Sequence, residues 1–322
     1  MVDNVSEETQ TQDLVYALAA SPGFAQDGVC FAARGSGLYR SDDGGTTWHP
    51  AYGSLNTEGA LATTAVLVSP EFESDQSVFA GVHGGILRSV DGGETWNAAI
   101  LRSPPPIIST LAVSPDFVRD GTLFAGTVED GVFRSADRGS RWSAWNFGLL
   151  DLSVISLAIS PRFAADETLF AGTETGIFRS TNGGRAWREV SFPTEFAPVL
   201  SLVLSPNYES DGVLFAGTES CGLFRSDDRG DTWTRPGEDV VDDIVNAIVL
   251  SPAFPASPDV LVMLSTALLI SRDGGQSWSD WGSGPISEGG DDRALASILA
   301  PQGLDTGAPL LVGLVEGGVL RL

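Results

Sequence analysis

The chain carries short apolar segments that recur in groups of four along most of its 322 residues. In one group the segments are VISLAIS (154–160), ETLFAGT (167–173), GIFRS (176–180) and AWREV (186–190). β-branched and aromatic residues interrupted by glycine, proline and serine are typical of strands joined by tight turns. The first segment is apolar at almost every position, and the last is more polar. The pattern predicts a four-stranded sheet whose first strand is buried on both faces.

An eight-residue turn separates the third and fourth segments of each group. Its six copies are SDDGGTTW (41–48), SVDGGETW (89–96), SADRGSRW (135–142), STNGGRAW (180–187), SDDRGDTW (226–233) and SRDGGQSW (271–278). Successive tryptophans lie 48, 46, 45, 46 and 45 residues apart, a period typical of four-stranded propeller blades. The residues expected to hold these turns are Asp43, Trp48, Asp91, Trp96, Asp137, Trp142, Asn182, Trp187, Asp228, Trp233, Asp273 and Trp278.

The composition of this turn has a mechanical explanation. An aspartate side chain accepts hydrogen bonds from nearby backbone N–H groups, and glycine adopts positive φ without steric cost. The closing tryptophan offers a large apolar face that fixes the turn on the blade. Asn182 keeps an acceptor but loses the charge, so we expect the fourth turn to form and to be slightly weaker.

Two further positions repeat along the chain. An aromatic residue follows a Ser-Pro pair before each second strand, and we expect it to pin this loop to the bottom rim: Phe24, Phe72, Phe117, Phe163, Tyr208 and Phe254. An arginine precedes the turn serine in five groups: Arg40, Arg88, Arg134, Arg179 and Arg225. A residue required in five blades indicates a structural partner, a repeated carboxylate or carbonyl, rather than one active site.

After the sixth turn the chain continues with ALASILAPQG, APLLVGLV and GGVLRL, which match the first three strands of a blade. We therefore predict an all-β, seven-bladed β-propeller of four-stranded antiparallel blades, with the repeated turn between the third and fourth strands. The blades span about 13–52, 60–100, 107–147, 153–191, 198–236, 244–282 and 293–322. Residues 2–6 are expected to add the outer strand of the last blade, so that no edge strand stays open.

The pattern S-x-D-x-G-x-x-W at blade spacing resembles the Asp-box, or BNR, repeat family. That family includes sialidases, xyloglucan-active hydrolases, sortilin-type receptors and photosystem II assembly factors. The resemblance implies a propeller with the box on the blade periphery, away from an active site, and it implies no particular function.

The sequence lacks the signatures of the enzymes in this family. No F/Y-R-I-P segment occurs, and the tyrosines have no setting that indicates a nucleophile. The xyloglucan hydrolases use two propellers, and this chain has length for one. We expect no catalysis, while paired carboxylates for acid and base work stay an alternative.

The composition of the chain indicates which classes of partner to expect. Asp and Glu number 42 against 18 basic residues, all arginine, for a formal charge of −24. Nucleic acid and anionic membranes should be repelled. Cys30 and Cys221 lack metal-type spacing, so we expect free thiols, no metal and no cofactor. Without a signal-like start or a membrane-length apolar run, the chain is expected to be cytoplasmic as written, and exported if a leader was removed.

One sector of the predicted ring is acidic. The loops that enter blades one, six and seven carry aspartates, and those blades become consecutive once the ring closes. The candidate partner-binding face comprises Asp13, Asp242, Asp243, Asp291, Asp292, Arg293 and Glu316. A solvated acidic rim is the simpler interpretation. Calcium stays open, although no segment has EF-hand spacing.

Two functions follow as hypotheses. The first is a non-catalytic scaffold that presents this acidic face to a basic or cationic protein partner, alone or as a subunit of an assembly. The second is a glycan-binding lectin or divergent glycoside hydrolase, for which Trp145 and Trp281 would stack on sugar if exposed. Covering the outer strand is their simpler role.

Overall fold

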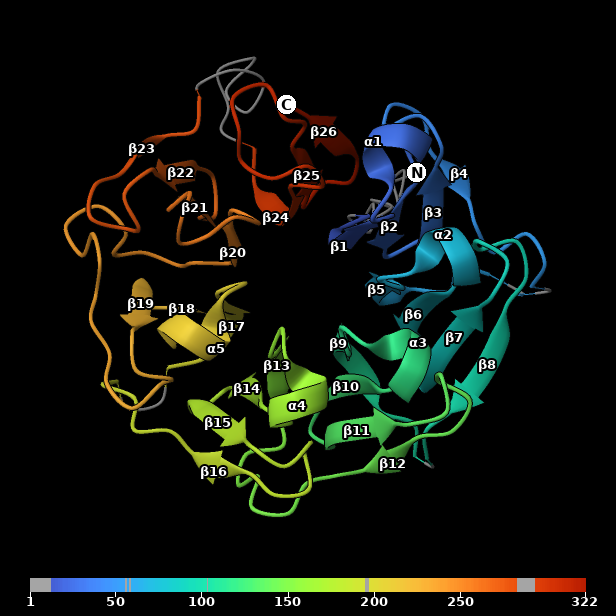
Figure 1. The fold of residues 1–322 in the computed structure, drawn as a ribbon. Coiled ribbons are helices and arrows are strands. Elements are labelled where there is room, and N and C mark those ends of the chain that lie inside the picture. The colour runs from blue at the N-terminus through green and yellow to red at the C-terminus, as the bar shows by residue number, and fades with distance from the viewer. Residues whose placement is uncertain (1–12, 56, 58, 103, 195–196, 283–292) are drawn as a thin grey trace, which may run out of the picture.

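The computed structural model describes residues 13–55, 57, 59–102, 104–194, 197–282 and 293–322. They form seven antiparallel sheets that follow one another around a ring (Figure 1). The first strand of each sheet lies nearest the centre of the ring, and the red last blade lies beside the blue first one. The predicted seven-bladed β-propeller is confirmed.

Blades 1 to 4 each have four strands in sequence order. Blade 1 has β1 (Val15–Ala20), β2 (Cys30–Arg34), β3 (Gly37–Ser41) and β4 (His49–Pro50). Blade 2 has β5 (Thr63–Val68), β6 (Val78–Val82), β7 (Gly85–Ser89) and β8 (Asn97–Ile100). Blade 3 has β9 (Ile107–Val113), β10 (Leu123–Val128), β11 (Gly131–Ser135) and β12 (Ser143–Ala144). Blade 4 has β13 (Val154–Ile159), β14 (Leu169–Thr173), β15 (Ile177–Ser180) and β16 (Arg188–Glu189).

Blades 5 and 7 depart from four full strands. Blade 5 has β17 (Val199–Leu204), β18 (Leu214–Thr218) and β19 (Leu223–Ser226), with an isolated bridge from Arg225 to Thr234 in place of a fourth strand. Blade 6 has β20 (Ala247–Leu250), β21 (Val260–Met263), β22 (Leu268–Ser271) and β23 (Ser279–Asp280). Blade 7 has β24 (Leu295–Leu299), β25 (Leu311–Leu314) and β26 (Val319–Arg321) within the described chain. The strand predicted from residues 2–6 lies outside the described residues.

Five of the six repeated aromatic residues begin one-turn helices before the second strands, whereas Phe254 lies in a turn. The helices are α1 (Phe24–Asp27), α2 (Phe72–Asp75), α3 (Phe117–Asp120), α4 (Phe163–Asp166) and α5 (Tyr208–Asp211). The aromatic side chain is buried and meets the preceding blade: the Phe117 ring lies edge-on to Phe79 with centroids 5.7 Å apart. A Ser–Asp hydrogen bond closes the same loop, as from Ser69 Oγ to Asp75 Oδ2 at 2.8 Å. The loop therefore ties two blades together.

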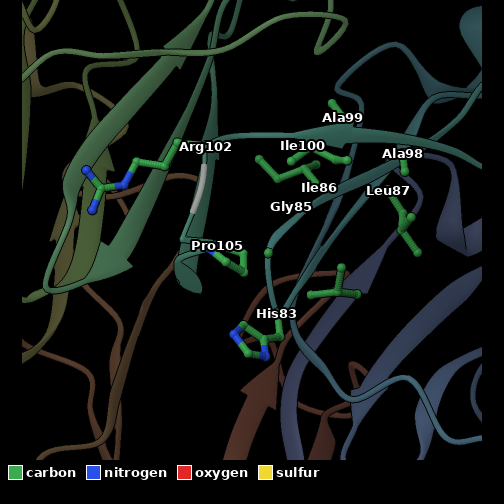
Figure 2. Close-up of a pocket in the computed structure, with 11 residues that line it drawn as sticks. His83, Gly85, Ile86, Leu87, Ala98, Ala99, Ile100, Arg102 and Pro105 are labelled. Atoms are coloured by element: carbon green, nitrogen blue, oxygen red, sulfur yellow. The ribbon is translucent and has the colours of Figure 1, made fainter.

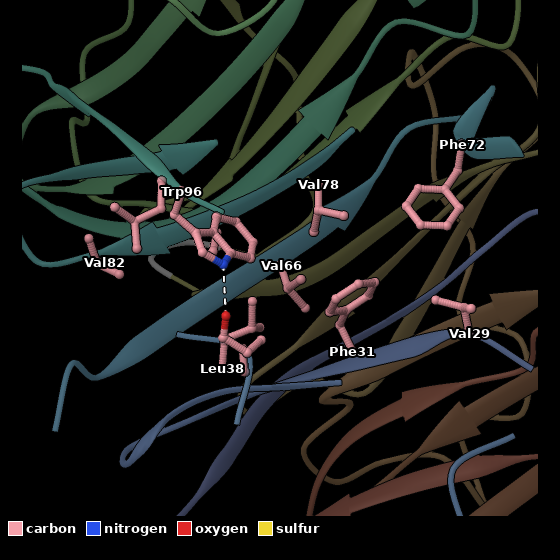
Figure 3. Close-up of a cluster of buried hydrophobic side chains, with 12 residues drawn as sticks. Val29, Phe31, Leu38, Val66, Phe72, Val78, Val82 and Trp96 are labelled. Atoms are coloured by element: carbon pink, nitrogen blue, oxygen red, sulfur yellow. Dashed lines mark hydrogen bonds between the residues drawn. The ribbon is translucent and has the colours of Figure 1, made fainter. Parts of the chain in front are cut away.

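The hydrophobic core is divided into seven clusters, one at each junction between neighbouring blades. The cluster between blades 1 and 2 includes Phe31, Phe72 and Trp96, and the indole N–H of Trp96 donates to Ala51 O at 2.9 Å across the junction (Figure 3). Among the described residues, the closing junction between blades 7 and 1 has the smallest buried set, Phe24, Cys30 and Leu311. Burial between blades, not within one sheet, thus holds the ring together.

Polar contacts also cross the closing junction. Ser297 Oγ donates to Val15 O at 2.8 Å, and Arg321 Nη1 approaches Asp43 O at 3.5 Å. Ser156 makes the same type of bond to Val199 O between blades 4 and 5, at 2.9 Å. The described residues of blades 7 and 1 are therefore joined as an ordinary pair of neighbours.

Candidate functional site

The strand register places two sets of loops on one rim of the ring. The first residue of an inner strand pairs with the last residue of the second strand, as Val154 does with Thr173 and Val199 with Thr218. The loop that enters each blade therefore lies beside the hairpin between its second and third strands. We call this edge, formed by the entry loops and these hairpins, the hairpin rim.

The opposite rim carries the Asp-box turns, because the third strand ends where the second begins; Leu169 pairs with Ser180. In the first box Asp43 Oδ1 accepts from Ser41 Oγ at 2.8 Å and from Thr47 N at 2.9 Å. Trp48 Nε1 donates to Gly45 O at 3.1 Å. Hydrogen bonds from Thr47 hold the pKa of Asp43 far below its usual value. The predicted turn chemistry is thus present, and it is structural.

The fourth box keeps its turn with a different set of groups. Asn182 Oδ1 accepts from Ser180 Oγ and from Ala186 N, each at 2.9 Å. Other boxes place a threonine, serine or arginine at the Ala186 position, where it bonds the second carboxylate oxygen; Thr232 Oγ1 donates to Asp228 Oδ2 at 2.6 Å. The box that has asparagine in place of aspartate is therefore the one whose seventh residue, Ala186, has no side-chain donor.

The repeated arginines join neighbouring blades. Arg40 Nη1 donates to Gly92 O and Arg225 Nη1 to Gly274 O, each at 2.6 Å, so the acceptor is a carbonyl in the next box. Arg134 and Arg179 make equivalent bonds, to Gly183 O and Arg229 O. The partner that these four arginines share is thus a carbonyl in the next blade. Arg40 and Arg225 also donate to a carboxylate in their own blade, Asp42 Oδ1 and Asp227 Oδ1, each at 2.6 Å, so both expected kinds of partner occur. Arg88 makes no such bond in the described part of the chain.

Three residues of the candidate acidic face meet where blades 7 and 1 join. Asp13 accepts from Ser36 N at 2.8 Å and from Ser36 Oγ at 2.9 Å, with Arg34 Nη1 3.9 Å away. Arg293 Nε lies 3.9 Å from Glu316 Oε1. Each of these two carboxylates therefore has a cation close by.

The remaining predicted residues lie at the entries to blades 6 and 7. Asp242 and Asp243 are exposed in the loop before β20, and Asp243 Oδ1 accepts from Ile244 N at 2.7 Å. Asp291 and Asp292 lie outside the described residues. The structure thus groups Asp13, Arg293 and Glu316 and places Asp242 and Asp243 at the entry to blade 6.

Sequence reasoning missed three acidic residues on the same rim. Glu129, Glu174 and Glu219 stand at the tips of the hairpins between the second and third strands of blades 3, 4 and 5, and all three are exposed. No ion pair involves them among the described residues. The repeated strand end AGT that precedes them, in β10, β14 and β18, is the signal from which they could have been found.

One acidic rim residue is structural. Asp151 accepts from Ser153 N at 3.0 Å, Thr175 N at 2.9 Å and Thr175 Oγ1 at 2.8 Å. Partial burial pushes the pKa of Asp151 up, but these hydrogen bonds outweigh it and hold the pKa below its usual value. Asp151 therefore fixes the entry loop of blade 4 to its hairpin.

The two additional tryptophans are half-buried. Arg134 Cζ lies 4.5 Å from the centroid of the Trp145 ring, and Trp187 Nε1 donates to Trp145 O at 2.8 Å. Arg272 Cζ lies 5.7 Å from the Trp281 ring, which packs on the core between blades 6 and 7. Both rings are therefore occupied by protein contacts.

Two other kinds of site are absent from the described ranges. No three His, Cys, Asp or Glu side chains there gather as a metal ion would require. No helix there is both long enough and apolar enough to cross a membrane.

The ring and its repeated turns define the fold, a seven-bladed β-propeller with Asp-box turns on one rim. Residues 39–50 and 269–280, which contain the first and sixth turns, match the family model for the BNR/Asp-box repeat. No curated protein matches the sequence.

Solved structures share the fold at low sequence identity. The GH74 xyloglucanase from Xanthomonas campestris is 18% identical with a TM-score of 0.75, over 97% of this chain and 52% of that chain. The extracellular domain of the putative one component system BT4673 from B. thetaiotaomicron is 14% identical with a TM-score of 0.70, over 96% and 38%. YCF48, solved bound to the D1 peptide, is 18% identical with a TM-score of 0.69, over 97% and 92%.

These likenesses concern the propeller alone. The chain spans about half the length of the xyloglucanase and less than two fifths of the BT4673 extracellular domain. At such identities these likenesses show a shared fold and nothing more.

Proposed function

We propose that this propeller is a non-catalytic scaffold that binds a basic segment of a partner protein along its hairpin rim. The observation that carries the proposal is the set of exposed glutamates at equivalent hairpin tips, Glu129, Glu174 and Glu219, which have no cationic partner among the described residues. Asp13, Asp242, Asp243, Arg293 and Glu316 extend the same rim around the ring.

The charge balance of the chain favours this class of partner. A formal charge of −24 repels nucleic acid and anionic membranes and accelerates encounter with cationic surfaces. Aspartates in the boxes are engaged in their own turns, so the free hairpin glutamates are the groups available to a partner. The YCF48 complex with the D1 peptide supports a peptide ligand on this fold.

A matched pair of variants tests the proposal. Glu174→Gln with Glu219→Gln removes two charges from the hairpin rim, and Glu71→Gln with Glu73→Gln removes two exposed charges from the opposite rim. The probe is a 12-residue arginine-rich peptide, compared with the same peptide carrying glutamine for arginine. Exposed ion pairs contribute up to about 1 kcal/mol each, so the rim variant should raise Kd about fivefold at low salt.

The dependence of the affinity on salt concentration is a second test. The affinity should fall as ionic strength rises, because exposed charges are screened beyond about 8 Å at physiological salt. Equal effects of the two double variants would contradict the proposal, since only overall charge would then matter. Unmeasurable binding of the arginine-rich peptide to the unaltered protein would also refute it.

The glycan-binding alternative rests on the likeness to the xyloglucanase. A stacking site for sugar would need Trp145 and Trp281 to be exposed, but both rings are half-buried and each is covered by an arginine. Binding on a glycan array, or turnover of a glycoside panel, would favour it over the scaffold.

A further inference from the structure

An apolar groove opens beside the outer strand of blade 2. It has a volume of about 360 Å³ and lies between the Ala98–Ala99–Ile100 segment of β8 and Pro105 (Figure 2). Gly84 and Gly85 contribute backbone without side chains to its lining, and an added Cβ at Gly84 would meet Pro105 Cβ. The groove is therefore shaped by small residues and proline.

The groove offers an unusual amount of free apolar surface. Ile100, at its edge, is 80% exposed. β8 has four residues, whereas β4, β12, β16 and β23 have two each, and it pairs with β7 alone in its sheet. An outer strand of this kind leaves backbone N–H and C=O groups available to an added extended segment, and the adjacent groove would receive its side chains.

The charge around the groove changes from neutral to acidic along the rim. His83 occupies the hairpin position in blade 2 that Glu174 occupies in blade 4, since each directly follows the second strand. Arg102 is paired with Asp130, next to Glu129, and its side chain points away from the other lining residues in Figure 2. The groove thus carries no unpaired carboxylate, and the acidic hairpins begin at the next blade.

Spacing connects the two features. Packed sheets lie about 10 Å apart, and an extended chain rises about 3.3 Å per residue. A bound extended segment would therefore need about three residues to pass from one blade to the next.

We propose that the groove anchors the partner segment, so that the ligand is an extended peptide with one large aliphatic or aromatic side chain in the groove. Arginine or lysine residues stand about three and six positions from this anchor, over Glu129 and Glu174. This inference rests on the proposed function and adds to it the composition and spacing of the partner. The anchor side chain of the peptide would contact Ile100, and the basic residues of the peptide would face the glutamates of the hairpins.

Peptides of defined composition test the inference. The probe is a 12-residue peptide with one leucine anchor and two arginines at the stated spacing, made in both orders along the chain. It is compared with a peptide that has serine for the leucine. The anchor should lower Kd about tenfold in at least one order, since burying such a side chain contributes about 1.5 kcal/mol or more.

Protein variants locate the effect. Ile100→Ser should remove the advantage of the anchored peptide. Val90→Ser, which removes a 48% exposed valine from the Asp-box turn of the same blade, should leave it unchanged. Ala98→Tyr, which fills the groove, should reduce affinity for the anchored peptide and not for the serine peptide.

The outcomes separate the two proposals. If both peptides bind with equal affinity and depend on Glu174 and Glu219, the rim proposal stands and the groove inference is wrong. If neither peptide binds, both fail. Sedimentation that reveals a dimer abolished by Ile100→Ser would assign the groove to a second copy of the chain and overturn the inference.

Discussion

Replacing Trp96 with phenylalanine should destabilise the protein much more than the same replacement of Trp48, although both residues close an Asp-box. Trp96 is 7% exposed, and its Nε1 donates to Ala51 O at 2.9 Å and to Gly93 O at 3.0 Å. Its ring also lies edge-on to Tyr52 with centroids 5.4 Å apart. Trp48 is half-buried, and among the described residues its Nε1 donates only within its own turn, to Gly45 O.

The magnitude follows from what each replacement leaves behind. Phenylalanine at position 96 leaves the buried carbonyl of Ala51 without this donor, which costs about 1–3 kcal/mol. The smaller ring also leaves space in the core between blades 1 and 2, which costs about 1 kcal/mol. The sum is about 2–4 kcal/mol, against about 1 kcal/mol or less for Trp48→Phe, whose site is open to water.

Urea-induced unfolding followed by far-UV circular dichroism measures both variants. The slope with urea should stay unchanged while the midpoint moves, because the same surface is exposed on unfolding. Equal midpoints for the two variants would refute the reasoning, since the bond across the junction would then contribute no more than a bond inside the turn.

Three further results are expected. Slight burial pushes the pKa of Asp91 up, but hydrogen bonds from Thr95 lower it from 3.8 to about 2. The stability that this carboxylate contributes is therefore complete above its unfolded pKa and is lost as the pH falls toward 2. Near-UV circular dichroism should be constant above about pH 4 and change below it, and loss of signal near neutral pH would contradict this. Asn182→Asp combined with Ala186→Thr should stabilise the fourth turn by about 0.5 kcal/mol more than the sum of the single variants, because the new threonine hydroxyl would donate to the new carboxylate oxygen. An additive double-mutant cycle in thermal unfolding would contradict this. Burial raises the pKa of the Cys30 thiol to about 12, so a thiol reagent should modify Cys221 in the native protein and Cys30 only after denaturation; rapid modification of two thiols under native conditions would rule this out.

The architecture could be predicted because its chemistry is local. Ser41, Asp43 and Gly45 bond one another within five residues, so the turn is visible in sequence and its period counts the blades. The repeated arginines were harder, because Arg40 bonds a carbonyl 52 residues away. Sequence alone indicated a structural partner and could not place it in the next blade.

The candidate site was harder to predict for a geometric reason. Counting back from strand ends finds the entry loops, which led to Asp13 and Asp243, and the only hairpin residue included was Glu316, because its loop lies in the same sector as those aspartates. Glu174 and Glu219 were missed on this account. The groove beside Ile100 depends on an outer strand two residues longer than its counterparts, which no repeat pattern reveals.

The small cluster at the closing junction has a consequence for synthesis. Phe24 and Cys30 are synthesised long before Leu311 of blade 7, which is part of their apolar cover. This flank of blade 1 would therefore stay exposed to water on a nascent chain until blade 7 has been synthesised. Chaperone dependence should concentrate on this late interval, and shortening the chain before β25 should yield aggregates rather than a smaller ring.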